Sequence, residues 1–180
     1  MMSGRPGEGR YAHVEREQRW LLDSLPAGVT DERAIIDHYL TGTTLRLRMI
    51  EGPSGAVFKL GQKIRVDESR PETVMLTNVY LTANEFDQLS VLPSSVVAKS
   101  RWIFDHEGVT FAVDEFKGRH VGLVMAEVEI GLSDLLLACP AFATVEVTGR
   151  NEFTGGWLAG APDEDVRRLL GGSILTGDSE

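Results

Sequence analysis

Residues 14–22 read Val-Glu-Arg-Glu-Gln-Arg-Trp-Leu-Leu, and this stretch decides how the rest of the chain is interpreted. Glu15, Glu17 and Arg19 occupy every second position, and a β-strand turns alternate side chains to the same face. On a helix, residues two apart do not face each other. The two carboxylates of such a strand lie about 7 Å apart. If their face is enclosed, a cation must lie between them: a metal, a basic side chain, or both.

The same alternation recurs in later stretches, with both signs of charge. The charged positions of five predicted strands are Glu15, Glu17, Arg19, Arg46, Arg48, Lys59, Lys63, Lys99, Arg101, Glu127 and Glu129, with Asp114 as a further candidate. The opposite faces of these strands are largely apolar. Two interpretations follow. Either the charges cover the outside of a small barrel with an apolar interior, or they line a wide lumen and the apolar faces pack outward against helices and loops.

The remaining pattern predicts a mainly β (α+β) protein, because strands joined by hairpins outnumber helices. Strands are predicted at residues 14–22, 35–40, 43–50, 56–66, 73–81, 96–106, 109–116, 121–131 and 144–148. Thr82 and Glu85 form a capping-box pattern that predicts a helix over 83–91. Further helical segments are predicted at 30–33, 133–137, 151–158 and 163–170. Such an order favours an antiparallel sheet that is closed or strongly curved.

Composition limits the possible functions. The 180 residues suit one domain, predicted at 11–160, with residues 1–10 and 171–180 as disordered tails. The sequence shows no membrane-spanning apolar run and no signal peptide. Cys139 is the single cysteine, so an internal disulfide is excluded and a reducing cytoplasm is expected. The net charge of -9 argues against nucleic-acid and anionic-membrane partners.

The charged positions together resemble a known family. Glu15-x-Glu17-x-Arg19 resembles the Glu-x-Glu-x-Lys signature of the CYTH family, also called triphosphate tunnel metalloenzymes. Further matches follow in the family's order: Arg46-x-Arg48, Lys59, Lys99-x-Arg101, Val113-Asp114-Glu115-Phe116, Gly122-Leu123, Ala126-Glu127-Val128-Glu129, and Val147-Thr148-Gly149-Arg150 with Phe153. The resemblance covers roughly residues 12–158, and the pattern looks most like the short bacterial inorganic triphosphatases.

The resemblance implies an eight-stranded antiparallel β-barrel around a hydrophilic tunnel, with short helices packed outside. It also implies metal-dependent hydrolysis of triphosphates, with tripolyphosphate as the expected small-molecule substrate and nucleoside and thiamine triphosphates as further candidates. A class IV adenylate cyclase and a noncatalytic polyphosphate- or nucleotide-binding protein are the alternatives. Whether the protein forms a homodimer is left open.

The resemblance also assigns roles to residues. The phosphate-binding candidates are Arg46, Arg48, Lys59, Lys99 and Arg101, joined by Arg19 and Lys63. Arginine suits phosphate because its planar fork donates to two oxygens. The candidate ligands for Mg or Mn are Glu15, Glu17, Glu127 and Glu129. Asp114, which could orient a water, and Arg19 are the catalytic candidates.

Two positions depart from the family pattern. Arg19 stands where lysine is usual, so a role that needs a neutral amine is lost. The strand at 73–81 usually carries a pair of alternating acids, but this one has none, and Glu72 comes too early. The departures bear on how much metal the site can hold.

Overall fold

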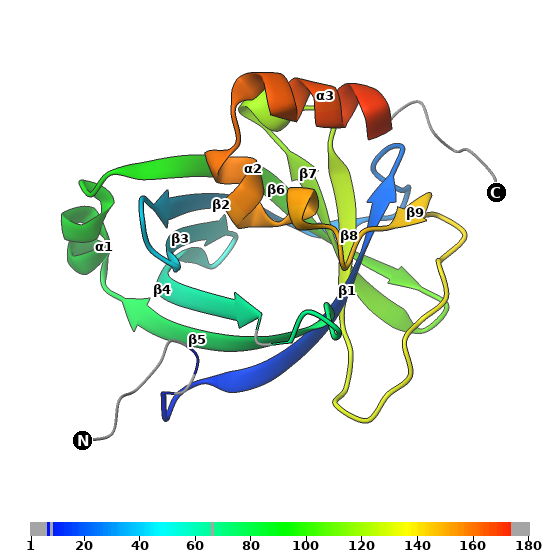
Figure 1. The fold of residues 1–180 in the computed structure, drawn as a ribbon, viewed down its shortest axis with the longest axis horizontal. Helices are drawn as coiled ribbons and strands as arrows, with labels where there is room; N and C mark the ends of the chain where they lie inside the picture. The colour runs from blue at the N-terminus through cyan, green and yellow to red at the C-terminus, as the bar shows by residue number, and fades with distance from the viewer. Residues whose placement is uncertain (1–6, 8, 66, 174–180) are drawn as a thin grey trace.

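The structure is a computed structural model that describes residues 7, 9–65 and 67–173. The chain forms a closed eight-stranded antiparallel barrel with a short ninth strand, which confirms the predicted fold class. Figure 1 shows how the strands are arranged. The strands are β1 (His13–Leu22), β2 (Thr30–Leu40), β3 (Leu45–Gly52), β4 (Gly55–Arg65), β5 (Thr73–Leu81), β6 (Ser94–His106), β7 (Val109–Phe116), β8 (Val124–Glu129) and β9 (Val145–Glu146). The helices are α1 (Ala83–Ser90), η1 (Gly118–His120), η2 (Asn151–Phe153), α2 (Gly155–Gly160) and α3 (Asp163–Ser173).

The barrel closes through β1, which has different partners along its length. The sheet runs in the order β5-β4-β3-β2-β6-β7-β8-β1, and a further pairing of β1 with β5 completes the ring. Residues 13–16 pair with residues 73–76 of β5, whereas residues 17–22 pair with β8. One strand therefore holds the two ends of the sheet together.

Apolar side chains pack outside the barrel and at one end of its lumen. Trp20 is fully buried and meets Phe111 edge-on, with the ring centroids 6.0 Å apart, in a cluster on the outer face of β1, β7 and β8. A second cluster joins Leu21 and Phe116 to Phe153 and to Leu158 of α2. The first cluster packs outward, as the wide-lumen interpretation predicts, whereas Phe116 and Phe153 of the second also line the cavity of the barrel.

The packed body extends past the predicted boundary at residue 160. Val166 of α3 is almost fully buried, and Leu169 and Leu170 pack against the second cluster. Residues 171–173, predicted as part of a tail, form the last turn of α3. The rest of the predicted tails lies largely outside the described residues, apart from Gly7, Gly9 and Arg10.

Two predicted helical segments are wrong. Residues 30–33 begin β2, where Asp31 has a positive φ of 53° and the pairing with β6 is irregular. Residues 133–137 form no helix because side chains of β1 bind this backbone instead. Arg16 donates to the carbonyls of Gly131, Leu132 and Asp134. The side-chain amide of Gln18 donates to the carbonyl of Leu137 and accepts a hydrogen bond from the backbone N–H of Leu137.

Gly155 is required where α2 meets β2. A Cβ at Gly155 would lie 1.9 Å from Tyr39 Oη, whereas one at Gly156 would lie 4.0 Å from the nearest atom of that ring. We expect Gly155→Ala to lower the free energy of unfolding by about 1–3 kcal/mol, since overpacking displaces side chains. Gly156→Ala is the matched control. Thermal unfolding of both variants checks the prediction, and equal melting temperatures would contradict it.

Candidate functional site

The barrel lumen holds a cavity of about 670 Å³, which we call the tunnel. Charged side chains from seven of the eight barrel strands line it. They are Glu15, Glu17, Arg19, Asp37, Arg46, Arg48, Lys59, Lys63, Arg65, Lys99, Arg101, Asp114 and Glu127, with Glu68 from the loop after β4. The structure therefore brings together all of the predicted site residues except one. Glu129 is exposed at the end of β8 and is not among the described residues that line the tunnel.

Asp37 of β2 holds the two arginines of β3. It accepts hydrogen bonds from Arg48 Nε at 2.6 Å and Nη2 at 2.7 Å, and Arg46 Nε lies 3.5 Å away. Burial raises the pKa of Asp37, but the bonds from Arg48 outweigh this and hold the pKa below its ordinary value. The pair fixes the fork of Arg48 inside the tunnel. Sequence reasoning missed Asp37, although it is the one carboxylate of the predicted strand at 35–40 and follows Ile35 and Ile36, which is a signal that it needs a buried partner.

Asp114 of β7 does the same for the cations of β6. Its carboxylate accepts from Lys99 Nζ at 2.5 Å and from Arg101 Nε and Nη2 at 2.7 Å each. Despite burial, which opposes ionisation, the charges of Arg101 and Lys99 hold the pKa of Asp114 well below its usual range. Burial, together with the charges of Arg101 and Arg48, lowers the pKa of Lys99. Asp114 therefore stays ionised and orients two cations.

Glu127 of β8 lies at the other side of Arg101. Its Oε1 is 3.6 Å from Arg101 Nη2. Burial would raise the pKa of Glu127, but Arg101 and then Lys63 lower it to about 2. Glu127 thus brings a permanent negative charge into the tunnel at neutral pH.

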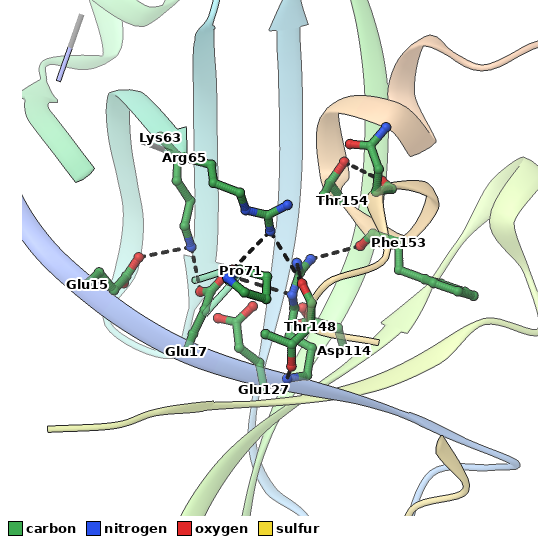
Figure 2. A network of polar contacts seen from close by, with 12 residues as sticks. Glu15, Glu17, Lys63, Arg65, Pro71, Asp114, Glu127, Thr148, Phe153 and Thr154 are labelled. Atoms are coloured by element: carbon green, nitrogen blue, oxygen red, sulfur yellow. Dashed lines mark hydrogen bonds and ion pairs between the residues drawn. The ribbon is translucent and has the colours of Figure 1, made fainter. Parts of the chain in front are cut away.

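Lys63 of β4 lies between the two glutamates of β1 (Figure 2). Its Nζ is 2.9 Å from Glu15 Oε2 and 2.5 Å from Glu17 Oε2. Burial, followed by the charge of Glu127, raises the pKa of Glu17 even so. The basic side chain that the spacing of residues 15 and 17 called for is therefore present.

Arg19 faces the tunnel but is bound to the backbone behind it. It donates from Nη1 to Phe153 O at 2.9 Å and from Nη2 to Thr148 O at 3.2 Å, and its Nε is 3.8 Å from Glu17 Oε1. These bonds fix η2 against β1. Its predicted catalytic and phosphate-binding roles have no direct support in these contacts.

Arg65 is a tunnel residue that sequence reasoning left out. Its Nη2 donates to Pro71 O at 3.1 Å and to Thr148 O at 3.3 Å (Figure 2). Arg19 donates to the same Thr148 carbonyl. The signal was available, because Arg65 continues the alternation of Lys59 and Lys63 along the same strand.

The tunnel face of β5 carries Val74, Leu76 and Asn78. An apolar and amide face therefore stands where the family resemblance would place a pair of acids. Glu72 does not replace them, since it lies 3.9 Å from Arg16 and 3.6 Å from Arg70 and is not among the described lining residues.

The donor set fits a divalent ion that a substrate helps to bind. Within the described ranges, no three Asp, Glu, His or Cys side chains are grouped so as to hold a metal on their own. Mg²⁺, however, usually takes one or two carboxylates together with substrate phosphates and waters. Glu17 and Glu127 both line the tunnel and offer two such carboxylates.

The chain is similar to known proteins in part of its sequence and in its fold. No protein-family model matches the chain. A stretch of 72 residues, 40% of this chain, is 37% identical to an inorganic triphosphatase of Acetivibrio thermocellus and covers 46% of that protein. The chain thus spans about half the length of this curated relative.

The barrel is also similar to two crystal structures of the protein NE1496. One of these structures is named as that of an inorganic triphosphatase. Both are 22% identical to this chain and cover 81% of it, with TM-scores of 0.56 and 0.55 over 97% and 93% of their own chains. The likeness shows a shared fold.

None of the helices in the described part of the chain has the length and apolar character to cross a membrane.

Proposed function

We propose that this chain, whose resemblance to the triphosphate tunnel metalloenzymes holds in both sequence and fold, hydrolyses triphosphates with the help of Mg or Mn. The observation that carries the proposal is a tunnel in which several buried cations and the carboxylates of Glu17 and Glu127 line one cavity. A triphosphate with a divalent ion matches such a lining, because its oxygens suit the cations and the ion suits the carboxylates. Tripolyphosphate is the proposed first substrate.

The cations would bind the phosphates in two ways. Arg48 and Arg101 are held by carboxylates that leave their forks oriented, which suits bidentate donation to phosphate oxygens. Lys99 and Arg46 lie beside them. Lys59 is placed differently, since its ammonium lies 4.9 Å from the centroid of the Tyr80 ring rather than against a described carboxylate.

Glu17 and Glu127 would hold the ion. When bound, Mg or Mn would neutralise phosphate charge and lower the pKa of a water for attack on a terminal phosphorus. Phosphoryl transfer depends on positioning and charge stabilisation, so a nucleophilic side chain is not needed. Asp114 would position Lys99 and Arg101, because its oxygens already accept their hydrogen bonds. Glu129 is left out of the proposed site because it is exposed.

Other expectations from the sequence remain predictions. They are a small-molecule partner rather than nucleic acid or a membrane, a cytoplasmic location, and an open question of homodimer formation. The net charge of -9 supports the first.

Product analysis tests the proposal. With Mn or Mg, we expect the protein to convert tripolyphosphate to pyrophosphate and orthophosphate at least as fast as it hydrolyses ATP or thiamine triphosphate. ATP should give ADP and orthophosphate, separated by chromatography. Cyclic AMP with pyrophosphate would replace the proposal by a cyclase. Binding of tripolyphosphate without any product would replace it by a noncatalytic sensor.

A further inference from the structure

On the basis of the triphosphatase function proposed above, we propose that the Lys63 ammonium is a built-in counter-ion of Glu15 and Glu17. It occupies the place between them that a metal ion would otherwise take. The tunnel therefore binds one divalent ion with each triphosphate, beside Glu17 and Glu127, rather than two.

The strand register brings Lys63 to the glutamates. In the barrel, β5 lies between β1 and β4, with Glu15 opposite Val74 and Lys63 opposite Leu76. Val74 and Leu76 line the tunnel between them and carry no charge. The ammonium reaches across this apolar face to both carboxylates, at 2.9 Å and 2.5 Å. Acids on β5, as the family resemblance implies, would instead surround the same space with negative charge.

Electrostatics keep Lys63 charged in this position. Two carboxylate oxygens lie within hydrogen-bond distance of its ammonium, and both favour the charged form. A second cation between Glu15 and Glu17 would meet this ammonium at close range. The same arrangement explains why Lys63 is not among the proposed phosphate-binding residues, since Glu15 and Glu17 already balance its charge.

Titration of the metal-free protein with Mn²⁺ alone tests the assignment by calorimetry, without any turnover. Lys63→Met removes the charge and keeps much of the stem. We expect this variant to bind Mn²⁺ at least about tenfold more tightly than the wild type. The substitution removes the repulsion between the ammonium and the ion, and that repulsion is larger than the free energy of a tenfold change in affinity. Lys63→Arg keeps the charge and should bind like the wild type. Lys59→Met, which removes a tunnel cation from the same strand, is the matched control.

Equal Mn²⁺ affinities of Lys63→Met, Lys59→Met and the wild type would overturn the proposal. Circular dichroism establishes whether Lys63→Met folds. If it does not, the wild type decides the matter by the number of Mn²⁺ ions bound per chain in the presence of a triphosphate analogue that resists hydrolysis. The proposal expects one ion, and two would contradict it. These readouts do not depend on hydrolysis, so they separate this assignment from the proposed activity.

Discussion

Replacing Asp114 by alanine should lower the free energy of unfolding by about 3–5 kcal/mol, the cost of leaving buried charges without their partner. Asp114 is 2% exposed and accepts three hydrogen bonds from Lys99 and Arg101. Without it, both cations remain in the tunnel wall, where burial and the charges of Arg101 and Arg48 already lower the pKa of Lys99. In the wild type the contribution of Asp114 is fully present above about pH 4. It is lost as the pH falls through the lowered pKa of this carboxyl.

Urea unfolding at neutral pH measures the effect, with Asp105→Ala as the control. Asp105 is an exposed aspartate of β6 that bonds Thr110. Tripolyphosphate should stabilise Asp114→Ala more than it stabilises the wild type, because the anion supplies the missing negative charge. A loss of less than about 1 kcal/mol, the size expected for surface ion pairs, would show that the cations are well solvated without Asp114.

Glu17→Gln should lower the rate of tripolyphosphate hydrolysis with Mn by about 100-fold or more, the size seen when a group that stabilises transition-state charge is removed. Glutamine keeps the size of the side chain but offers the ion a neutral oxygen in place of a carboxylate. The substitution also removes one of the two carboxylates that contact the Lys63 ammonium. The fold should persist. Burial of the Glu17 carboxylate disfavours its charged form and is the main cause of its raised pKa, and the neutral glutamine avoids this cost.

Steady-state phosphate release over a range of Mn concentrations separates the causes. A lost metal ligand should raise the Mn concentration needed for half-maximal rate as well as lowering the maximum. Glu115→Gln is the control, since Glu115 lies next to Asp114 on β7 and pairs outside the tunnel with Lys117. Normal Mn-dependent turnover in Glu17→Gln would remove Glu17 from the metal site.

The period of two along a strand made most of the tunnel predictable from the sequence. Residues 15, 17 and 19, like 46 and 48 or 99 and 101, share one face of an extended strand. All the predicted charged positions except Glu129 therefore line the tunnel, whereas Asp37 and Arg65 were left out. Alternation does not say how far along a strand the tunnel extends. Glu129 shares its face with Glu127 but lies beyond the tunnel, where it is exposed.

Features that depend on distant pairing could not be predicted in this way. Lys63 meets Glu15 because β5 pairs with β1, which follows from closure of the barrel and from no local pattern. Residues 133–137 have helical spacing, but Arg16 and Gln18 of β1 bind their backbone groups. In both cases a partner more than forty positions away outweighed local preference.

The division of β1 between β8 and β5 has a consequence for how the chain reaches its native state. Hairpins such as β3–β4 and β6–β7 can form from neighbouring segments, but both partners of β1 come far later in the sequence. Such nonlocal pairing is slow, because a long loop must close before any contact rewards it. Until residues 13–16 meet residues 73–76, β1 and β5 present open edges with unpaired backbone groups. Incompletely closed chains are therefore the species at risk of joining edge to edge, and slow closure rather than weak packing sets how long that risk lasts.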